Sequence, residues 1–130
     1  MPGTLLLDSE GLSKLYLKDR TVMALVQAAA EEGVRVATTA MTTLEADYER
    51  IHRARITWVL SRIDVHDVTA DITDKAAALL RTHHLHGHKY AIDAVLAAVA
   101  RTAPAPVTVL TSDPEDLTLL CGPTIEVVKV

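Results

Sequence analysis

Short apolar runs and longer stretches of helical periodicity alternate along this chain. The runs are short enough to be buried strands, and the longer stretches repeat apolar positions every three or four residues, as one face of a helix does. The predicted strands cover residues 4–7, 34–37, 65–68, 107–110 and 125–128. This alternation predicts an α/β fold, a three-layer α/β/α sandwich with a mostly parallel five-stranded sheet.

The connections between the strands have helical patterns. Two helices occupy the segment between the first two strands, and Gly33 is placed to end the second of them. A break is expected near Ala54, Gly87 is expected to stop a helix, and Pro104 follows the end of another. The other predicted helical segments cover residues 43–62, 71–83, 90–101 and 114–120.

Composition limits the size and class of the protein. The 130 residues are 49% hydrophobic and 23% charged, which is typical of one globular domain spanning residues 1–130. Only 3% are aromatic and none is Phe, so the core must consist of aliphatic side chains and an aromatic platform for stacking RNA bases is excluded. The longest apolar stretch, residues 94–100, is far shorter than the roughly 20 residues that cross a bilayer.

Charge and cysteine content limit the expected cellular compartment and the kind of ligand. The single cysteine, Cys121, has no internal partner and the N-terminus lacks the basic region of a secretory signal, so we expect a cytoplasmic protein. The formal net charge of −4 excludes a strong non-specific nucleic-acid binder. It is compatible with an RNA or DNA substrate held partly through metal, because carboxylates committed to a divalent cation would offset that charge.

Acidic residues follow predicted strands at the edge where parallel sheets bind ligands. Asp8 ends the first strand and Asp113 lies just beyond the fourth. Each also has a structural interpretation, because Asp8 could cap the next helix and Asp113, with Asp116 three residues later, has the form of a capping box. Glu45 shares this ambiguity, since it stands three residues after Thr42. The pattern leaves both interpretations open for these acids.

Asp93 differs from the other acids because its surroundings are apolar. Every other residue from 91 to 100 is apolar, including its helical neighbours Leu96 and Ala97. A carboxylate on such a helix costs several kcal/mol unless it is paired or binds a cation. The structural alternative is an ion pair with Lys89, four residues earlier.

Four segments together resemble the PIN-domain nucleases, and among these most resemble the VapC-type toxins of bacterial toxin–antitoxin pairs. They are residues 6–9 (LLDS), 43–46 (TLEA), 91–98 (AIDAVLAA) and 110–117 (LTSDPEDL). The resemblance covers nearly the whole chain and implies a PIN fold with metal-dependent endoribonuclease activity. One departure is Leu117, where many relatives have an aromatic residue.

The resemblance also implies roles for the acids and for partners. By position, Asp8, Glu45, Asp93 and Asp113 match the catalytic acidic quartet of the family, and Asp116 matches a further acid of some members. The implied cofactor is Mg²⁺ or Mn²⁺, with Asp8, Asp93, Asp113 and Asp116 as metal ligands. The implied partners are an RNA substrate, an antitoxin protein and a second copy of the chain. For a homodimer we expect a surface within residues 11–30 or 71–84, because the composition is apolar enough to leave a patch to bury.

Other residues suggest different chemistry. His83, His84, His86 and His88 crowd around Gly87, but their spacing is poor for zinc and no cysteine accompanies them. Arg50, Arg53, Arg55 and Arg62 form a basic concentration, for which a solvated helix face is the default interpretation and RNA-backbone contact the alternative.

Two further functions are compatible with parts of the pattern. A haloacid-dehalogenase-like phosphatase would also place an acid at Asp8, but Glu10 stands where that family has a second aspartate and the chain is short for that fold. A non-catalytic binding module could keep a PIN fold as a partner surface. Metal binding discriminates the nuclease from the binding module.

Overall fold

The computed structural model describes residues 2–130, whose fold is built around a parallel sheet. The strands pair in the order β3-β2-β1-β4-β5, and every neighbouring pair runs parallel. They are β1 (Thr4–Leu7), β2 (Arg35–Thr39), β3 (Asp64–His66), β4 (Val107–Thr111) and β5 (Glu126–Lys129). The predicted α/β fold with a five-stranded parallel sheet is confirmed.

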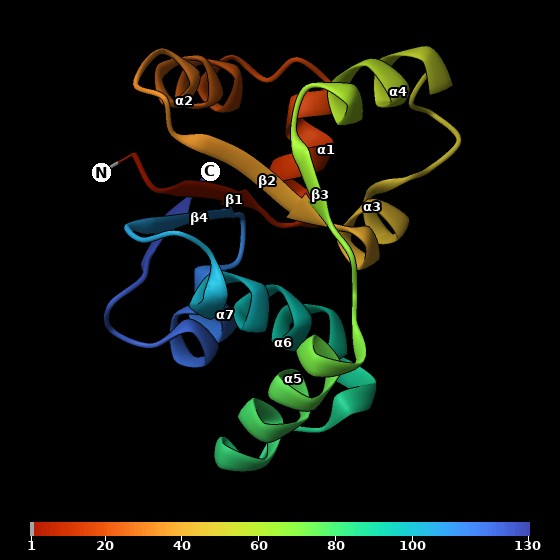
Figure 1. Cartoon of the computed structure of the whole chain (residues 1–130). Helices are drawn as coiled ribbons and strands as arrows, with labels where there is room; N and C mark the ends of the chain where they lie inside the picture. The colour runs from red at the N-terminus through yellow and green to blue at the C-terminus, as the bar shows by residue number, and fades with distance from the viewer. Residues whose placement is uncertain (1) are drawn as a thin grey trace.

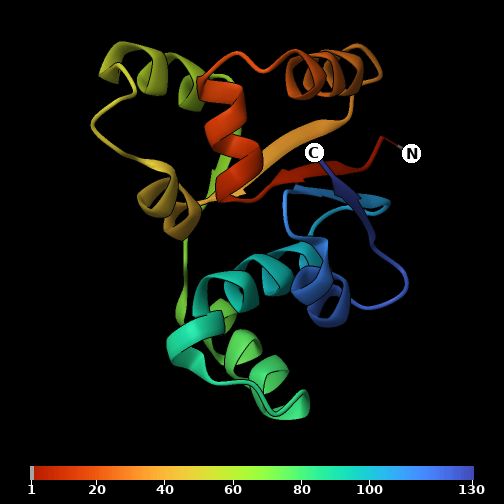
Figure 2. The ribbon, with the colours of Figure 1, turned by 180° about the vertical axis from the view of Figure 1, so that it is seen from behind.

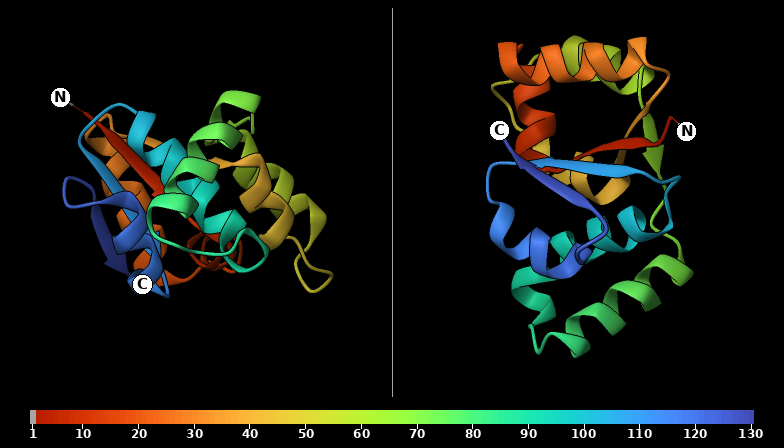
Figure 3. Two further views of the ribbon diagram at one scale, coloured as in Figure 1. Left: turned by 90° about the horizontal axis from the view of Figure 1, so that it is seen from below. Right: turned by 90° about the vertical axis from the view of Figure 1, so that its left-hand side faces the viewer.

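Within residues 2–130, helices pack on both faces of this sheet (Figure 1). They are α1 (Ser9–Tyr16), α2 (Arg20–Glu31), α3 (Ala40–Ala46), α4 (Arg53–Ser61), α5 (Ala70–Thr82), α6 (Gly87–Thr102) and α7 (Pro114–Cys121). Helices α1, α2 and α4 lie on one side of the sheet, and α5, α6 and α7 lie on the other, as the reverse view and the right panel of Figure 3 also show (Figures 2 and 3).

The strand order explains this division of the helices. The chain moves from β1 outward to β2 and β3, and then returns past β1 to β4 and β5. Because crossovers between parallel strands are right-handed, reversing the direction of travel moves the connecting helices to the opposite face. The reversal occurs between β1 and β4, and in such sheets the ligand site lies at the carboxyl ends of the strands on either side of that point.

Alternating side chains of β1 join the two halves of the core. Leu5 and Leu7 pack with the α1–α2–α4 side, whereas Leu6 packs with α6 and α7 on the other side. Leu6 and Leu7 have no exposed surface, and burying one leucine completely contributes about 1.5–3 kcal/mol. The central strand, at whose end Asp8 lies, is therefore held from both faces.

The predicted helical segment 43–62 divides earlier than expected. Helix α3 begins at Ala40, because the Thr39 hydroxyl accepts a hydrogen bond of 3.0 Å from the Thr42 backbone N–H and caps it. The helix ends at Ala46, and α4 begins only at Arg53. The predicted break therefore exists, but it covers residues 47–52, and Ala54 is already the second residue of α4.

Gly87 was expected to stop a helix, and instead it begins one. Helix α5 ends at Thr82, and His84 rather than a glycine adopts the left-handed conformation beyond that end, with φ of 55°. Helix α6 then runs for 16 residues from Gly87. None of the helices between residues 2 and 130 is long and apolar enough to cross a membrane.

Candidate active site

Asp8 directly follows β1 and is held by the backbone of its neighbours. Its N–H donates to the Leu110 carbonyl at 3.1 Å, and its carboxylate accepts from the Gly11 N–H at 2.8 Å. The residue is only 7% exposed. Burial raises the pKa of this carboxyl, whereas hydrogen bonds from Gly11 and the Thr111 side chain oppose that rise. Asp8 is thus both a helix cap and a buried acid at the carboxyl end of the central strand.

Thr111 connects Asp8 to the end of β4. It is 1% exposed, and its hydroxyl accepts a hydrogen bond of 3.0 Å from the Asp113 N–H, while its side chain also hydrogen-bonds Asp8. Thr111 is not among the residues predicted from the sequence, although a hydroxyl at the end of an otherwise apolar strand was a usable signal. Thr111 fixes the spacing between the chain segments that carry Asp8 and Asp113.

Asp93 lies on α6 and is half-buried. Its pKa is raised to about 6, first by burial and then by the negative charges of Asp8, Asp116, Glu45 and Asp113. Those acids lie far from Asp93 in the sequence, and the fold brings them near enough for their negative charges to act on its carboxyl group. We call Asp8, Glu45, Asp93, Asp113 and Asp116 the acidic cluster.

The structure does not support helix capping as the role of the Glu45 and Asp113 side chains. Thr42 is an internal residue of α3, so the capping box with Glu45 is absent and Glu45 is exposed near the end of that helix. Asp113 occupies the N-cap position of α7, but its carboxylate makes no capping hydrogen bond. Asp116 is half-buried in the first turn of the same helix. Of the sequence-predicted caps, the side chain of Asp8 forms one and that of Asp113 does not.

The alternative partner of Asp93 lies elsewhere. The Lys89 ammonium stands 5.2 Å from the centre of the Tyr90 ring. The ion pairs among the described residues are Arg35–Asp64, Arg53–Asp47 and Lys75–Asp71. Asp93 therefore has no ion-pair partner in this part of the chain, although it is half-buried beside other acids.

Comparison with known proteins identifies the fold. No family model matches the sequence, and no curated protein matches it. A chain in the crystal structure of VapBC2 from Rickettsia felis bound to a DNA fragment from their promoter superposes with a TM-score of 0.70 over 98% of both chains, at 14% identity. The fold is similar to that of the VapC PIN domain. At this low identity the likeness concerns the fold alone.

The donor chemistry of the acidic cluster suits a hard cation. All five side chains offer carboxylate oxygens, which Mg²⁺ and Mn²⁺ prefer. Among residues 2–130, no three His, Cys, Asp or Glu side chains are already grouped closely enough to hold a metal ion. Mg²⁺ usually keeps several waters and uses one or two carboxylates directly, so it does not require a preformed cage of protein ligands.

The basic residues near α4 are largely engaged in structural contacts. Arg55 donates from Nε to the Tyr16 carbonyl at 3.1 Å and from Nη2 to the Leu15 carbonyl at 2.9 Å, which satisfies the end of α1. The guanidinium groups of Arg55 and Arg62 lie 5.1 and 4.8 Å from the centre of the Trp58 ring. Arg50 is exposed. A uniformly solvated helix face is therefore the wrong description of Arg55.

Proposed function

We propose that this protein is a metal-dependent endoribonuclease that hydrolyses RNA phosphodiester bonds, the toxin of a toxin–antitoxin pair. The observation that carries the proposal is Asp93, a half-buried carboxylate without an ion-pair partner in residues 2–130 and surrounded by four other acids. The surrounding negative charges oppose the ionisation of Asp93 unless a cation neutralises them. The PIN-like fold supports the same assignment.

The residues of the acidic cluster would have different roles in the reaction. Asp8, Asp93, Asp113 and Asp116 would hold Mg²⁺ or Mn²⁺, and Glu45, which is exposed as Asp113 is, would orient the attacking water together with them. The cation, when bound, supplies Lewis-acid stabilisation of the phosphate and a more acidic water. Thr111 and the Gly11 N–H hold Asp8 in place, so that its carboxylate does not reorient when charge develops.

Two other functions make different demands on the same residues. A haloacid-dehalogenase-like phosphatase needs a second aspartate two residues after Asp8, and the residue there is Glu10, exposed in the first turn of α1. A non-catalytic module needs none of the acids. We favour the nuclease because the cluster joins acids from four segments of the chain, which neither alternative requires.

A paired measurement of cleavage and melting tests this proposal. We expect the protein to cut a structured RNA with Mn²⁺ or Mg²⁺ and not in EDTA, and its melting temperature to rise with Mn²⁺. Asp93→Asn should abolish both effects. Glu115→Gln is the matched control, because Glu115 is an exposed acid beside Asp116 that is not among the charges raising the Asp93 pKa.

The outcomes separate the three functions. Hydrolysis of a phosphomonoester that depends on Glu10 would indicate the phosphatase. Neither cleavage nor a metal-dependent melting shift would indicate the binding module. The toxin assignment needs its own test, growth arrest on expression that is relieved by the protein encoded next to this gene. RNA cleavage without growth arrest would leave a nuclease that is not a toxin.

A further inference from the structure

A small hollow lies between the end of α1 and the segment that leads into α4. Its volume is about 200 Å³, and its lining includes Lys18, Arg50, His52 and Arg55. Three of the chain's 13 lysines and arginines therefore meet here, although the whole chain has a formal charge of −4. Within residues 2–130, no Asp or Glu lines this hollow. We call it the basic hollow, and its four basic residues are those just named.

The charges of the basic hollow are not neutralised within the described part of the chain. Its four basic residues belong to none of the ion pairs that residues 2–130 form. The neighbouring Arg53 does have an acid close by, because its Nη1 atom lies 4.0 Å from an Asp47 carboxylate oxygen. Those two residues line a different hollow, between α3 and α4. Like charges gathered without a counter-ion repel one another, so an anion among them is stabilised.

The start of α4 adds partial positive charge to the basic hollow. His52 occupies the N-cap position, but its side chain makes no capping hydrogen bond, and the first turn contains no acidic residue. The first backbone N–H groups of a helix have no partner inside the helix, and the helix dipole is positive at this end. This end of α4 therefore attracts an anion beside side chains that do the same.

Lys18 has a backbone conformation that glycine adopts more easily. Its φ is 61°, in the left-handed region just beyond the end of α1, where glycine is the usual residue. A lysine there is strained, because its Cβ atom approaches the following carbonyl oxygen. Lys18 thus costs the fold some stability while it contributes a cation to the basic hollow.

Tyr16 also lines the basic hollow and contains an unsatisfied donor. It is only 2% exposed, and its hydroxyl has no hydrogen-bond partner among residues 2–130. Burial raises the pKa of this phenol to about 12, so the hydroxyl keeps its proton at physiological pH. Buried donors normally have an acceptor, and a ligand rich in oxygen atoms could supply one here.

We propose that the basic hollow binds a phosphate group, at a site distinct from the acidic cluster. A phosphate offers oxygen acceptors to the Lys18 ammonium, the Arg50 guanidinium and the first N–H groups of α4 together. Arg55 already donates to the Leu15 and Tyr16 carbonyls, so it contributes mainly its charge. The ligand is a free phosphate ion or a phosphate of a bound RNA strand.

This site lies at the opposite end of α1 from the acidic cluster. Asp8 caps the start of that helix, and Tyr16 is its last residue. Eight residues at about 1.5 Å each separate the two ends by about 12 Å. A phosphate in the basic hollow therefore does not compete with the acids for a cation, and the proposal does not depend on the proposed nuclease activity.

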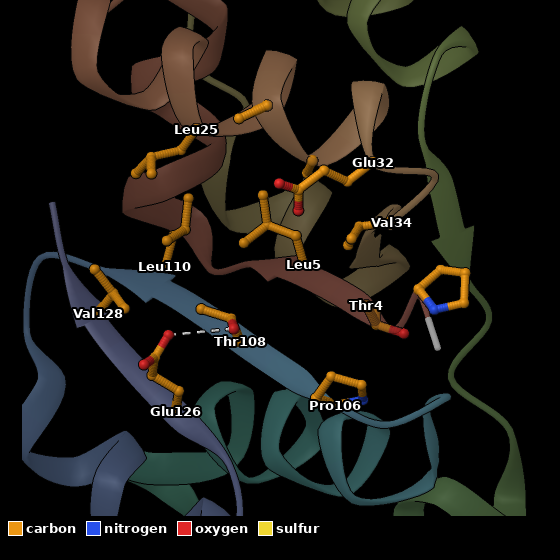
Figure 4. Close-up of a pocket in the computed structure, with 13 residues that line it drawn as sticks. Thr4, Leu5, Leu25, Glu32, Val34, Pro106, Thr108, Leu110, Glu126 and Val128 are labelled. Atoms are coloured by element: carbon orange, nitrogen blue, oxygen red, sulfur yellow. Dashed lines mark hydrogen bonds between the residues drawn. The ribbon is translucent and has the colours of Figure 1, made fainter.

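A second hollow provides a contrast, because its chemistry does not suit an anion. It lies between α2 and β4–β5 and has a volume of about 440 Å³ (Figure 4). Glu32 and Glu126 line it, whereas no Lys, Arg or His of residues 2–130 does. Glu126 accepts a hydrogen bond from Thr108, and most of the other lining residues are apolar. We therefore expect phosphate to bind at the basic hollow and not here.

Tryptophan fluorescence tests the basic hollow directly. Trp58 is the only tryptophan of the chain, and the Arg55 guanidinium, at the hollow, lies 5.1 Å from the centre of its ring. In EDTA, we expect inorganic phosphate to change this fluorescence saturably, while sodium chloride at equal ionic strength does not. Arg50→Gln removes a charge-assisted contact and should weaken phosphate binding about tenfold or more.

Lys18→Gly separates binding from folding. It should weaken phosphate binding as Arg50→Gln does, and it should leave the melting temperature unchanged or raise it, because glycine relieves the left-handed strain. Arg53→Gln is the matched control, since Arg53 is an exposed arginine at the same helix start that lines the other hollow. It should leave phosphate binding nearly unchanged. Equal weakening by Arg50→Gln and Arg53→Gln would indicate general electrostatic attraction and would overturn the proposal, as would the absence of any saturable change with the parent protein.

A short single-stranded RNA, titrated in EDTA, distinguishes the two sources of phosphate. RNA that binds more tightly than inorganic phosphate and depends on Arg50 would place a phosphate of the strand in the hollow. RNA that does not displace inorganic phosphate would leave the free ion as the ligand, and both results support the site. Asp93→Asn should lose RNA cleavage and keep phosphate binding. A protein that binds phosphate through Arg50 and never cuts RNA would retain this site and refute only the nuclease.

Discussion

The Asp8 carboxylate accepts the Gly11 N–H at 2.8 Å in a place where α1 almost touches β4. A Cβ atom on Gly11 would lie 3.0 Å from the Leu110 carbonyl oxygen and 3.5 Å from the Asp8 Oδ1 atom. The same Leu110 carbonyl receives the Asp8 N–H. The glycine therefore sets the distance between the helix that Asp8 caps and the strand that precedes Asp113.

Gly11→Ala should destabilise the protein, although alanine is the better helix former. Inside a helix this change normally stabilises by about 0.5–1 kcal/mol. Here α1 must move away from β4, and overpacking of this kind costs about 1–3 kcal/mol. Denaturant unfolding measures the change. Gly87→Ala is the matched control, because the nearest atom to a Cβ there is Leu80 Cδ1 at 3.8 Å, an ordinary contact. Equal effects of the two substitutions would contradict this account of Gly11.

Asp93→Asn should change how stability depends on pH in the absence of metal. The folded-state pKa of about 6 lies above the ordinary value of 3.8, so the folded protein binds the Asp93 proton more firmly than the unfolded chain does. The stability contribution of this group consequently falls as pH rises from 3.8 to about 6 and stays unfavourable above that. Asparagine lacks this loss. In EDTA we expect the variant to melt a few degrees above the parent at about pH 7.5 and level with it near pH 4.

The control for this experiment is Asp74→Asn, the same chemical change at an exposed position of α5. It should not alter the pH profile. If Asp93→Asn lowered the melting temperature at neutral pH, Asp93 would have a stabilising partner, and the electrostatic repulsion described for the acidic cluster would be wrong.

Asp113 and Asp19 allow a comparison between an acid that caps a helix and one that does not. Asp19 accepts the Val22 N–H at 3.0 Å, whereas Asp113 at the equivalent position of α7 makes no such bond. Asp19→Ala should therefore cost about 1 kcal/mol of stability without affecting RNA cleavage. Asp113→Ala should cost much less stability and reduce cleavage strongly. The two unfolding curves and the two cleavage rates form the test, and a reversed pattern would remove Asp113 from the site.

Arg55→Lys should destabilise the protein despite keeping the charge. Lysine cannot reproduce the fork that binds the Leu15 and Tyr16 carbonyls, nor the planar stacking on Trp58. Losing such contacts should cost about 1–2 kcal/mol. Arg50→Lys, at an exposed position in the α3–α4 connection, is the control and should be neutral. Tryptophan fluorescence reports both unfolding and the environment of Trp58.

The sequence predicted the strands well because strands of a parallel sheet are buried on both faces and therefore form short, continuous apolar runs. It also singled out Asp93, since an apolar helix offers a carboxylate no solvated side. It misplaced the start of α3, because Thr39 belongs to a strand by pattern and acts as a cap only through its side-chain hydrogen bond to Thr42. The left-handed conformation of His84 was equally invisible, since glycine is the usual residue there.

Features that depend on how separate elements pack together could not be predicted from the hydrophobic and polar pattern of the sequence. Thr111 is one, because its importance arises from a hydroxyl placed between β1 and β4.

The short length of α3 gives the acids of the cluster unequal rigidity. With seven residues, α3 is shorter than any helix that is stable on its own, and Glu45 lies near its end, just before an irregular segment. The Asp8 amide, in contrast, is bonded to β4 within the buried sheet. In hydrogen exchange, α3 should open locally many times before the Asp8 amide is exposed by global unfolding. Glu45 is thus carried by an element that opens locally, whereas Asp8 is held in the sheet. Local opening of α3 therefore sets how often Glu45 leaves the other four acids.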